Sequence, residues 1–209
     1  MTAGAVGALV GVWAIAVVSP GPDLVVVLQR ALAGRRHGLA TAAGVVVGIT
    51  VWLVAAFAGL AAVLRVQPGL MTVLQVAGGL LLAAVGALGL RAWWRTRGQR
   101  QGLAAPIGAA RIGGDLARGL ATNLSNPKAV AFFGAVLAPF LTTDLGVGAA
   151  VSLVAVMVAV ALAWFGALAV AASHPAVHAR IGRVLPWVDL AVSAAFVAVG
   201  VAFVIVALA

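Results

Sequence analysis

Long apolar runs with few interruptions are the feature of this sequence that most restricts its fold. Of the 209 residues, 65% are hydrophobic and 8% are charged, and the mean hydropathy is +1.21. A soluble domain carries about 25% charged residues, so this chain has too few charges to cover a surface exposed to water. A lipid bilayer accepts apolar side chains on the outside of a protein. The sequence therefore predicts an integral membrane protein.

Six segments approach or exceed the length of about 20 residues that a helix needs to cross the roughly 30 Å hydrocarbon core. They are 5–29, 38–64, 70–90, 119–141, 147–172 and 185–207. Runs of this length favour helices over barrel strands. We expect an all-α integral membrane fold of six transmembrane helices in one domain, 1–209. A connection over 91–118 separates a first half of three spans, 1–90, from a second half of three spans, 119–209. Because each half has an odd number of spans, the two halves enter the membrane from opposite sides, which predicts inverted topology.

Arginines gather in alternate connections and predict the orientation. The first, third and fifth connections carry Arg30, Arg35 and Arg36, then Arg91, Arg95, Arg97, Arg100, Arg111 and Arg118, then Arg180 and Arg183. The second has Arg65 and the fourth has Asp144. Basic connections stay in the cytoplasm, so we expect both termini outside. Although the net charge is +9, its placement between apolar runs indicates contact with lipid headgroups, and we expect no nucleic-acid partner.

Several kinds of chemistry lack the necessary residues. The chain has no Cys and no Glu, and its three His residues lie in or beside basic connections. We therefore expect no disulfide, metal or other cofactor. A membrane enzyme acting on a lipid phosphate is disfavoured because few acids and histidines are available, and an accessory subunit would leave the polar interruptions described next unexplained. The start lacks a basic region, so we expect the first apolar segment to be retained.

The first span is interrupted by Pro20, Gly21 and Pro22. Each proline removes a backbone donor and clashes with the preceding turn, and glycine lowers helix propensity. A helix from residue 5 to Pro20 covers about 22 Å, which is less than the bilayer core, so we expect the break within the membrane. Asp23 follows the break directly, and a carboxylate at that depth is unfavourable unless it is paired or hydrated.

The fourth span is interrupted around Asn126 and Pro127, between Asn123 and Lys128. The apolar run that follows is too short to cross alone, and counting from the outer face places both breaks at a similar depth. Irregular backbone inside a membrane often marks a substrate site. We predict that the two breaks meet and that Asp23 and Lys128 bring opposite charges together, which would suit the ammonium and carboxylate of an amino acid.

Other roles for the same residues remain open. Asp23 could cap the helix that follows the break. Lys128 could extend its ammonium to the cytoplasmic interface. Asn123 and Asn126 could satisfy the interrupted backbone, and the prolines are better suited to shaping the chain than to contacting a ligand.

Two motifs around the breaks resemble the signatures of the LysE/RhtB family of amino-acid exporters. The first is Ser19-Pro20-Gly21-Pro22-Asp23, followed by Arg30 and the turn over 34–39. The second runs from Gly119 to Ala129 and is followed by Phe132-Phe133. The separation of the motifs, the chain length and the six spans agree, so the resemblance covers nearly the whole chain.

The resemblance implies efflux of amino acids across the cytoplasmic membrane of a prokaryote, in exchange for protons. The sequence does not decide between a monomer and a homodimer. It implies that 20–23 and 126–128 are functional elements. The candidates for substrate binding or proton coupling are thus Asp23, Lys128, Asn126, Asn123, Pro20, Gly21, Pro22 and Pro127. The chain departs from the family pattern at Ile49, where many members have an acidic or polar residue, and it has no Tyr. With one acid fewer, we expect a neutral rather than a dibasic substrate.

Overall fold

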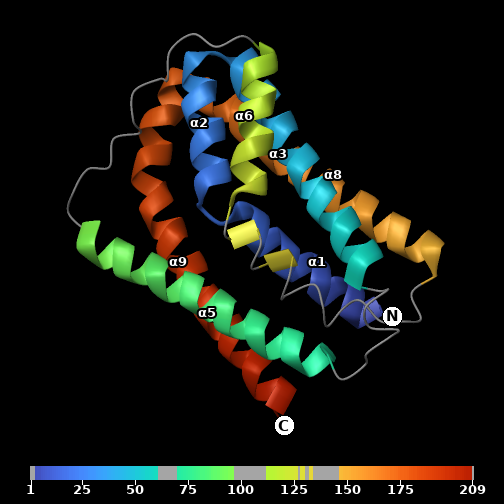
Figure 1. Cartoon of the computed structure of the whole chain (residues 1–209). Coiled ribbons are helices and arrows are strands. Elements are labelled where there is room, and N and C mark those ends of the chain that lie inside the picture. Colours follow the sequence, from blue (N-terminus) through green and yellow to red (C-terminus); the bar gives the residue numbers. More distant parts are fainter. Residues whose placement is uncertain are drawn as a thin grey trace.

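The computed structural model describes residues 3–60, 70–96, 112–126, 128–129, 132–133 and 146–208. Every regular element in these residues is helical. The elements are α1 (Ala3–Val18), α2 (Pro22–Ala33), α3 (Arg35–Ala55) with a π-helical continuation η1 (Ala56–Leu60), α5 (Leu70–Thr96), α6 (Ile112–Leu124), α8 (Val147–Ala172) and α9 (Pro175–Leu208). Figure 1 shows α2, α6 and the start of α3 gathered at one end of the molecule.

Four helical stretches are long and apolar enough to cross a membrane: Arg35–Ala58, Val76–Arg95, Val147–Ala172 and Pro186–Leu208. Together α1 and α2 also qualify, as a pair bent by 51°. The described residues therefore contain four candidate spans, or five when the bent pair is one span, as a multi-pass membrane protein requires. The predicted span 119–141 lies in part outside the described residues, so the count of six remains a prediction.

Two helices extend beyond the predicted spans. Helix α5 continues to Thr96, so the start of the predicted connection 91–118 is helical, as is its end in α6. Trp93 packs against Trp187, with ring centroids 5.7 Å apart, which supports the added turn. Helix α9 begins at Pro175, ahead of the predicted span 185–207, and Pro186 lies inside it; its part that is apolar enough to cross a membrane, Pro186–Leu208, agrees with that span. The α8 bounds agree with the prediction.

The break between α1 and α2 follows from local chemistry. Val18 is the last residue of α1, and Gly21 precedes Pro22 at the start of α2. Proline disfavours helical geometry in the residue before it, but it fits the first turn of a helix, where its missing N–H needs no partner. The sequence Pro20-Gly21-Pro22 therefore ends α1 and begins α2.

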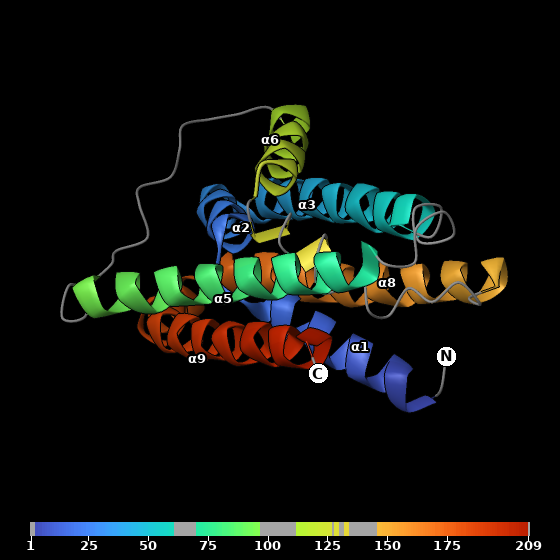
Figure 2. The same ribbon diagram turned by 60° about the horizontal axis from the view of Figure 1, so that its bottom comes forward.

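Glycines set the distance between α3 and α6. A Cβ on Gly44 would overlap the carbonyl of Leu116, and a Cβ on Gly119 would overlap the carbonyl of Thr41. Only residues without a side chain allow two helix backbones to approach this closely. In Figure 2, α6 crosses α3 at the top of the molecule. This contact fixes the end of α6, and the residues after it, over the break between α1 and α2.

The pair α5 and α9 packs in the same way. Gly79 lies against the carbonyl of Gly200, and Gly86 lies against the carbonyl of Ser193; a Cβ on either glycine would come within 2.6 Å of that oxygen. Between the helix groups lies a core that includes Leu9, Val45, Leu53, Met157 and Ala161. Phe196 of α9 also belongs to this core, so the pair is joined to the remaining helices close to the two breaks.

Candidate functional site

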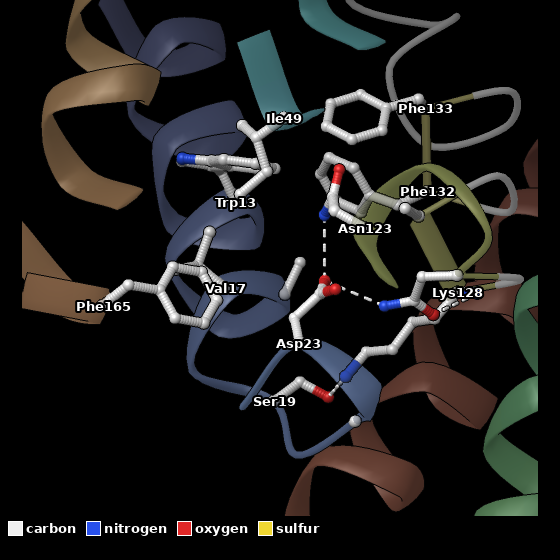
Figure 3. A pocket seen from close by; sticks show the side chains of 14 residues that line it. Trp13, Val17, Ser19, Asp23, Ile49, Asn123, Lys128, Phe132, Phe133 and Phe165 are labelled. Carbon is white, nitrogen blue, oxygen red and sulfur yellow. Dashed lines mark hydrogen bonds between the residues drawn. The ribbon is translucent and has the colours of Figure 1, made fainter. Parts of the chain in front are cut away.

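Asp23 is held by two amides from the second break. Asn123 Nδ2 and Asn126 Nδ2 each donate to Asp23 Oδ2 at 2.9 Å, and both asparagines are buried. Asp23 comes from the first turn of α2, whereas Asn123 lies in the last turn of α6 and Asn126 follows that helix. Figure 3 shows Asp23 and Asn123 facing each other. The two breaks therefore meet, which brings together three of the predicted site residues.

Lys128 binds the other side of the first break. Its Nζ donates to Ser19 Oγ and, at 2.9 Å, to the carbonyl oxygen of Pro20. Its backbone N–H donates to Asn126 Oδ1 at 3.0 Å. Because α1 ends at Val18, the carbonyl of Pro20 lacks a helical partner and accepts the ammonium instead. Lys128 thus points into the protein, and its Nζ lies 5.2 Å from the ring centroid of Phe196.

A pocket of about 440 Å³, part of it open to solvent, lies between these groups. Its polar lining is Ser19, Asp23, Asn123, Asn126 and Lys128, together with Gly21. Its apolar lining is Trp13, Ala16, Val17, Ile49, Ala129, Phe132, Phe133 and Phe165. The pocket is therefore charged at one end and apolar at the other (Figure 3).

Two acceptor atoms at the polar end have no hydrogen bond within the described part of the chain. They are Asp23 Oδ1 and Asn123 Oδ1, both buried. A buried oxygen without a donor is destabilising by about 1–3 kcal/mol, and most buried polar atoms in proteins are paired. A ligand that supplies N–H groups would remove this penalty at both atoms.

Gly48 positions Asn123. A Cβ at this residue of α3 would lie 2.6 Å from Asn123 Oδ1. The absence of a side chain therefore lets the asparagine sit against α3 while its amide reaches Asp23. The spacing of Gly44 and Gly48 predicts a close helix contact, but the sequence does not show that Asn123 is the residue that packs there.

The remaining predicted residues take different places. Pro22 is exposed at the start of α2, and Gly21 lines the pocket. Pro127 lies outside the described residues. Ser19 was part of the first motif but not among the predicted site residues; it is buried beside Lys128. The apolar lining was not predicted either, although Trp13, Ala16 and Val17 have the spacing of one helix face.

A second charged cluster lies at the far end of α2. Arg30 Nε is 2.6 Å from Asp115 Oδ1, and His37 Nδ1 is 2.5 Å from Asp115 Oδ2. Burial would raise the pKa of the Asp115 carboxyl, but the hydrogen bond to His37 and the Arg30 guanidinium outweigh it and hold that pKa below its usual range. The sequence placed Arg30 among the charges of a connection, whereas its side chain is fully buried in α2.

This cluster joins three helices. Arg30 belongs to α2, His37 to α3 and Asp115 to α6. The turn between α2 and α3 is made by Gly34, whose φ of 146° is a conformation that side chains rarely adopt. The cluster and the turn together hold α6 against the α2–α3 pair on the side away from the pocket.

Known proteins are similar to this chain over nearly its whole length. Residues 14–206 match the LysE type translocator family. A threonine efflux protein of Salmonella typhi is 32% identical over 193 residues, which cover 91% of this chain and 93% of that protein. The threonine efflux protein of Escherichia coli strain K12 is 31% identical over 195 residues, with the same coverage.

A leucine efflux protein of Klebsiella pneumoniae is 36% identical over 113 residues, which cover 53% of this chain and 51% of that protein. No solved structure matches the chain significantly. The match to the family extends across both breaks and through the last helix, and two relatives align over nearly their full length. The chain therefore belongs to the LysE type translocator family.

Proposed function

We propose that this chain exports neutral amino acids across the cytoplasmic membrane of a prokaryote in exchange for protons. As a member of a translocator family with amino-acid efflux relatives, it is a transport protein and not an enzyme. The observation that carries the proposal is the pocket between the two breaks, where a half-buried carboxylate and an ammonium approach from different segments. An amino acid presents the complementary pair of charges.

The ammonium of the substrate fits the carboxylate oxygen that lacks a donor. Asp23 lines the pocket, and its Oδ1 has no hydrogen bond within the described residues. An ammonium has three N–H donors, so it can bond Asp23 Oδ1 while it balances the charge of Asp23. A charge-assisted bond of this kind is roughly twice as strong as a neutral one.

The carboxylate of the substrate is attracted by Lys128. The ammonium of Lys128 is held near Pro20 and Ser19 by hydrogen bonds, so its position does not depend on the substrate. Among the described residues that line the pocket, Asp23 is the one acid. A second ammonium on the substrate would have no carboxylate here, which favours neutral over dibasic amino acids.

Asp23 is also the proposed site of proton exchange. It is the acid that the substrate ammonium would neutralise, and a proton neutralises it equally well. Proton binding and substrate binding would then compete for one carboxylate, which is a simple way to couple opposite movements. Asn123 and Asn126 can donate to Asp23 in either state because their amides do not titrate.

The proposal includes a topology in the membrane. The arginine-rich connections lie in the cytoplasm by the positive-inside rule, and both termini lie outside. The chain is one domain of six spans, with halves over 1–90 and 119–209 of inverted topology. The Arg30, His37 and Asp115 cluster would then lie near the cytoplasmic face. Protons, lipid and the amino acid are the proposed partners, and a homodimer is the proposed assembly.

The test is efflux from liposomes that contain the purified protein and a labelled neutral amino acid. We expect efflux to be faster when the outside is acidic, and to slow when an ionophore removes the pH gradient. Asp23→Asn should abolish the response to the gradient, and Lys128→Met should weaken substrate binding. Arg36→Gln, an exposed residue away from the pocket, is the control. Export that Asp23→Asn leaves unchanged would contradict the mechanism.

A further inference from the structure

We infer that the apolar end of the pocket is a side-chain subsite that selects aliphatic over hydroxylated amino acids, with Ile49 as a specificity-determining residue. This inference rests on the proposed function, because it assigns the other end of the same pocket. If Asp23 and Lys128 hold the charged groups, then the substrate side chain points toward the apolar lining.

Three aromatic rings form one side of the subsite, and we call them the aromatic wall: Trp13, Phe132 and Phe133. The ring centroids are 5.2 Å apart for Trp13 and Phe132, 5.6 Å for Trp13 and Phe133, and 5.4 Å for the two phenylalanines. Trp52 stacks on Phe133 with a centroid distance of 6.1 Å. Contacts between rings at these distances are favourable, so the wall is a firm surface rather than a set of independent side chains.

The aromatic wall offers a substrate no hydrogen-bond partner. Its one polar atom, Trp13 Nε1, donates to the carbonyl of Met157 at 2.9 Å. The other apolar lining, from Val17, Ile49 and Phe165, adds no donor or acceptor side-chain atom. A substrate hydroxyl placed against this surface would lose its bonds to water without replacement, whereas a methyl group would gain contacts.

Ile49 lies where the charged and apolar ends meet. It follows Gly48, which lies against Asn123, and its own side chain is buried and lines the pocket. Figure 3 shows Ile49 beside Trp13 and on the same side of the pocket as Phe133. A substrate held at Asp23 would therefore bring the first atoms of its side chain close to Ile49.

Valine and threonine test this subsite most directly, because they have nearly the same shape and differ by a methyl in place of a hydroxyl. The relatives that align over nearly their full length are threonine efflux proteins, so a preference for threonine would be the simple expectation. The subsite predicts the opposite: valine should be favoured by about tenfold, the factor expected for one unpaired buried hydroxyl.

The experiment measures efflux of labelled valine and threonine from liposomes containing the wild-type protein, with alanine as a third substrate. Ile49→Thr places a hydroxyl in the subsite and should reduce the valine-to-threonine ratio at least threefold. Val47→Thr, on the exposed side of the same helix, makes a similar change away from the pocket and should leave the ratio unchanged. The wild-type ratio tests the subsite even if a variant does not fold.

The possible results separate the two claims. If alanine and valine leave the liposomes and valine exceeds threonine, the subsite is supported. If amino acids are exported but threonine equals or exceeds valine, the subsite is wrong and the proposed function stands. If none of a full panel of amino acids leaves, the proposed function is wrong, and the subsite fails with it. An equal shift of the ratio by Val47→Thr would also refute the role of Ile49.

Discussion

Removing the charge of Asp115 should destabilise the protein strongly, because it leaves Arg30 buried without its closest counter-charge. Both side chains are fully buried, and their closest atoms are 2.6 Å apart. Breaking a buried ion pair by removing one partner destabilises proteins by about 3–5 kcal/mol. For a chain of this size, each kcal/mol lowers the melting temperature by about 2–4 °C. We therefore expect Asp115→Asn to lower it by about 6–20 °C.

Thermal unfolding of the purified protein in detergent, followed by tryptophan fluorescence, measures this change. Arg36→Gln removes an exposed charge from the start of α3 and is the control, with an expected change below about 2 °C because exposed charges contribute little. The variants should be compared at one pH and one detergent concentration. The difference between Asp115→Asn and the control then reports the buried pair.

A double variant separates a charge effect from a general loss of packing. In Arg30→Met with Asp115→Leu, no charge remains without a partner, and replacing a buried pair by apolar groups is often neutral or stabilising. We expect it to melt above Asp115→Asn alone, which is a non-additive result. A double variant that melts at the sum of the two single losses, or a single variant that melts like the wild type, would refute the reasoning.

Three other changes follow from the same structure. The pKa of Asp115 is lowered from the ordinary 3.8, so the folded protein binds a proton at this carboxylate more weakly than the unfolded chain does. The stability that the ionised carboxylate contributes is complete above about pH 4 and is lost as the pH falls through the lowered pKa. Melting curves should therefore show a steeper loss below pH 4 in the wild type than in Asp115→Asn, and equal slopes would count against it. Gly119→Ala, which overlaps the carbonyl of Thr41, should destabilise by about 1–3 kcal/mol, whereas Gly113→Ala in the same helix has open space and should not; similar melting temperatures would argue against tight packing of α3 on α6. Gly34→Val should lower the melting temperature, because a residue with a side chain is strained at the φ of 146° that Gly34 adopts. An unchanged melting temperature would contradict this prediction.

The sequence predicted the parts of the fold that depend on local chemistry. Two prolines flanking a glycine remove backbone donors and lower helix propensity, so the first break was predictable. The contact of Asp23 with polar residues of the second break was predictable, because a carboxylate at the expected membrane depth needs a polar partner. The start of α9 was not, because Arg180 and Arg183 were assigned to a basic connection, whereas they lie within this helix.

The parts that depend on distant contacts could not be predicted. Arg30 looks like any other arginine of a basic connection until Asp115 is placed beside it. The aromatic wall combines Trp13 with Phe132 and Phe133, and no periodicity within one segment shows that these rings meet. Gly48 carries no functional group, and its role appears only when Asn123 packs against it.

The bend between α1 and α2 places two helix ends of opposite polarity at the pocket. A helix terminus carries about half an elementary charge, positive at the N-terminus and negative at the C-terminus. Asp23 sits in the positive first turn of α2, and Lys128 binds the carbonyl of Pro20 just past the negative end of α1. Peptide dipoles have no proton to gain or lose. The polarity that stabilises both side chains therefore stays the same whatever the protonation state of the acid.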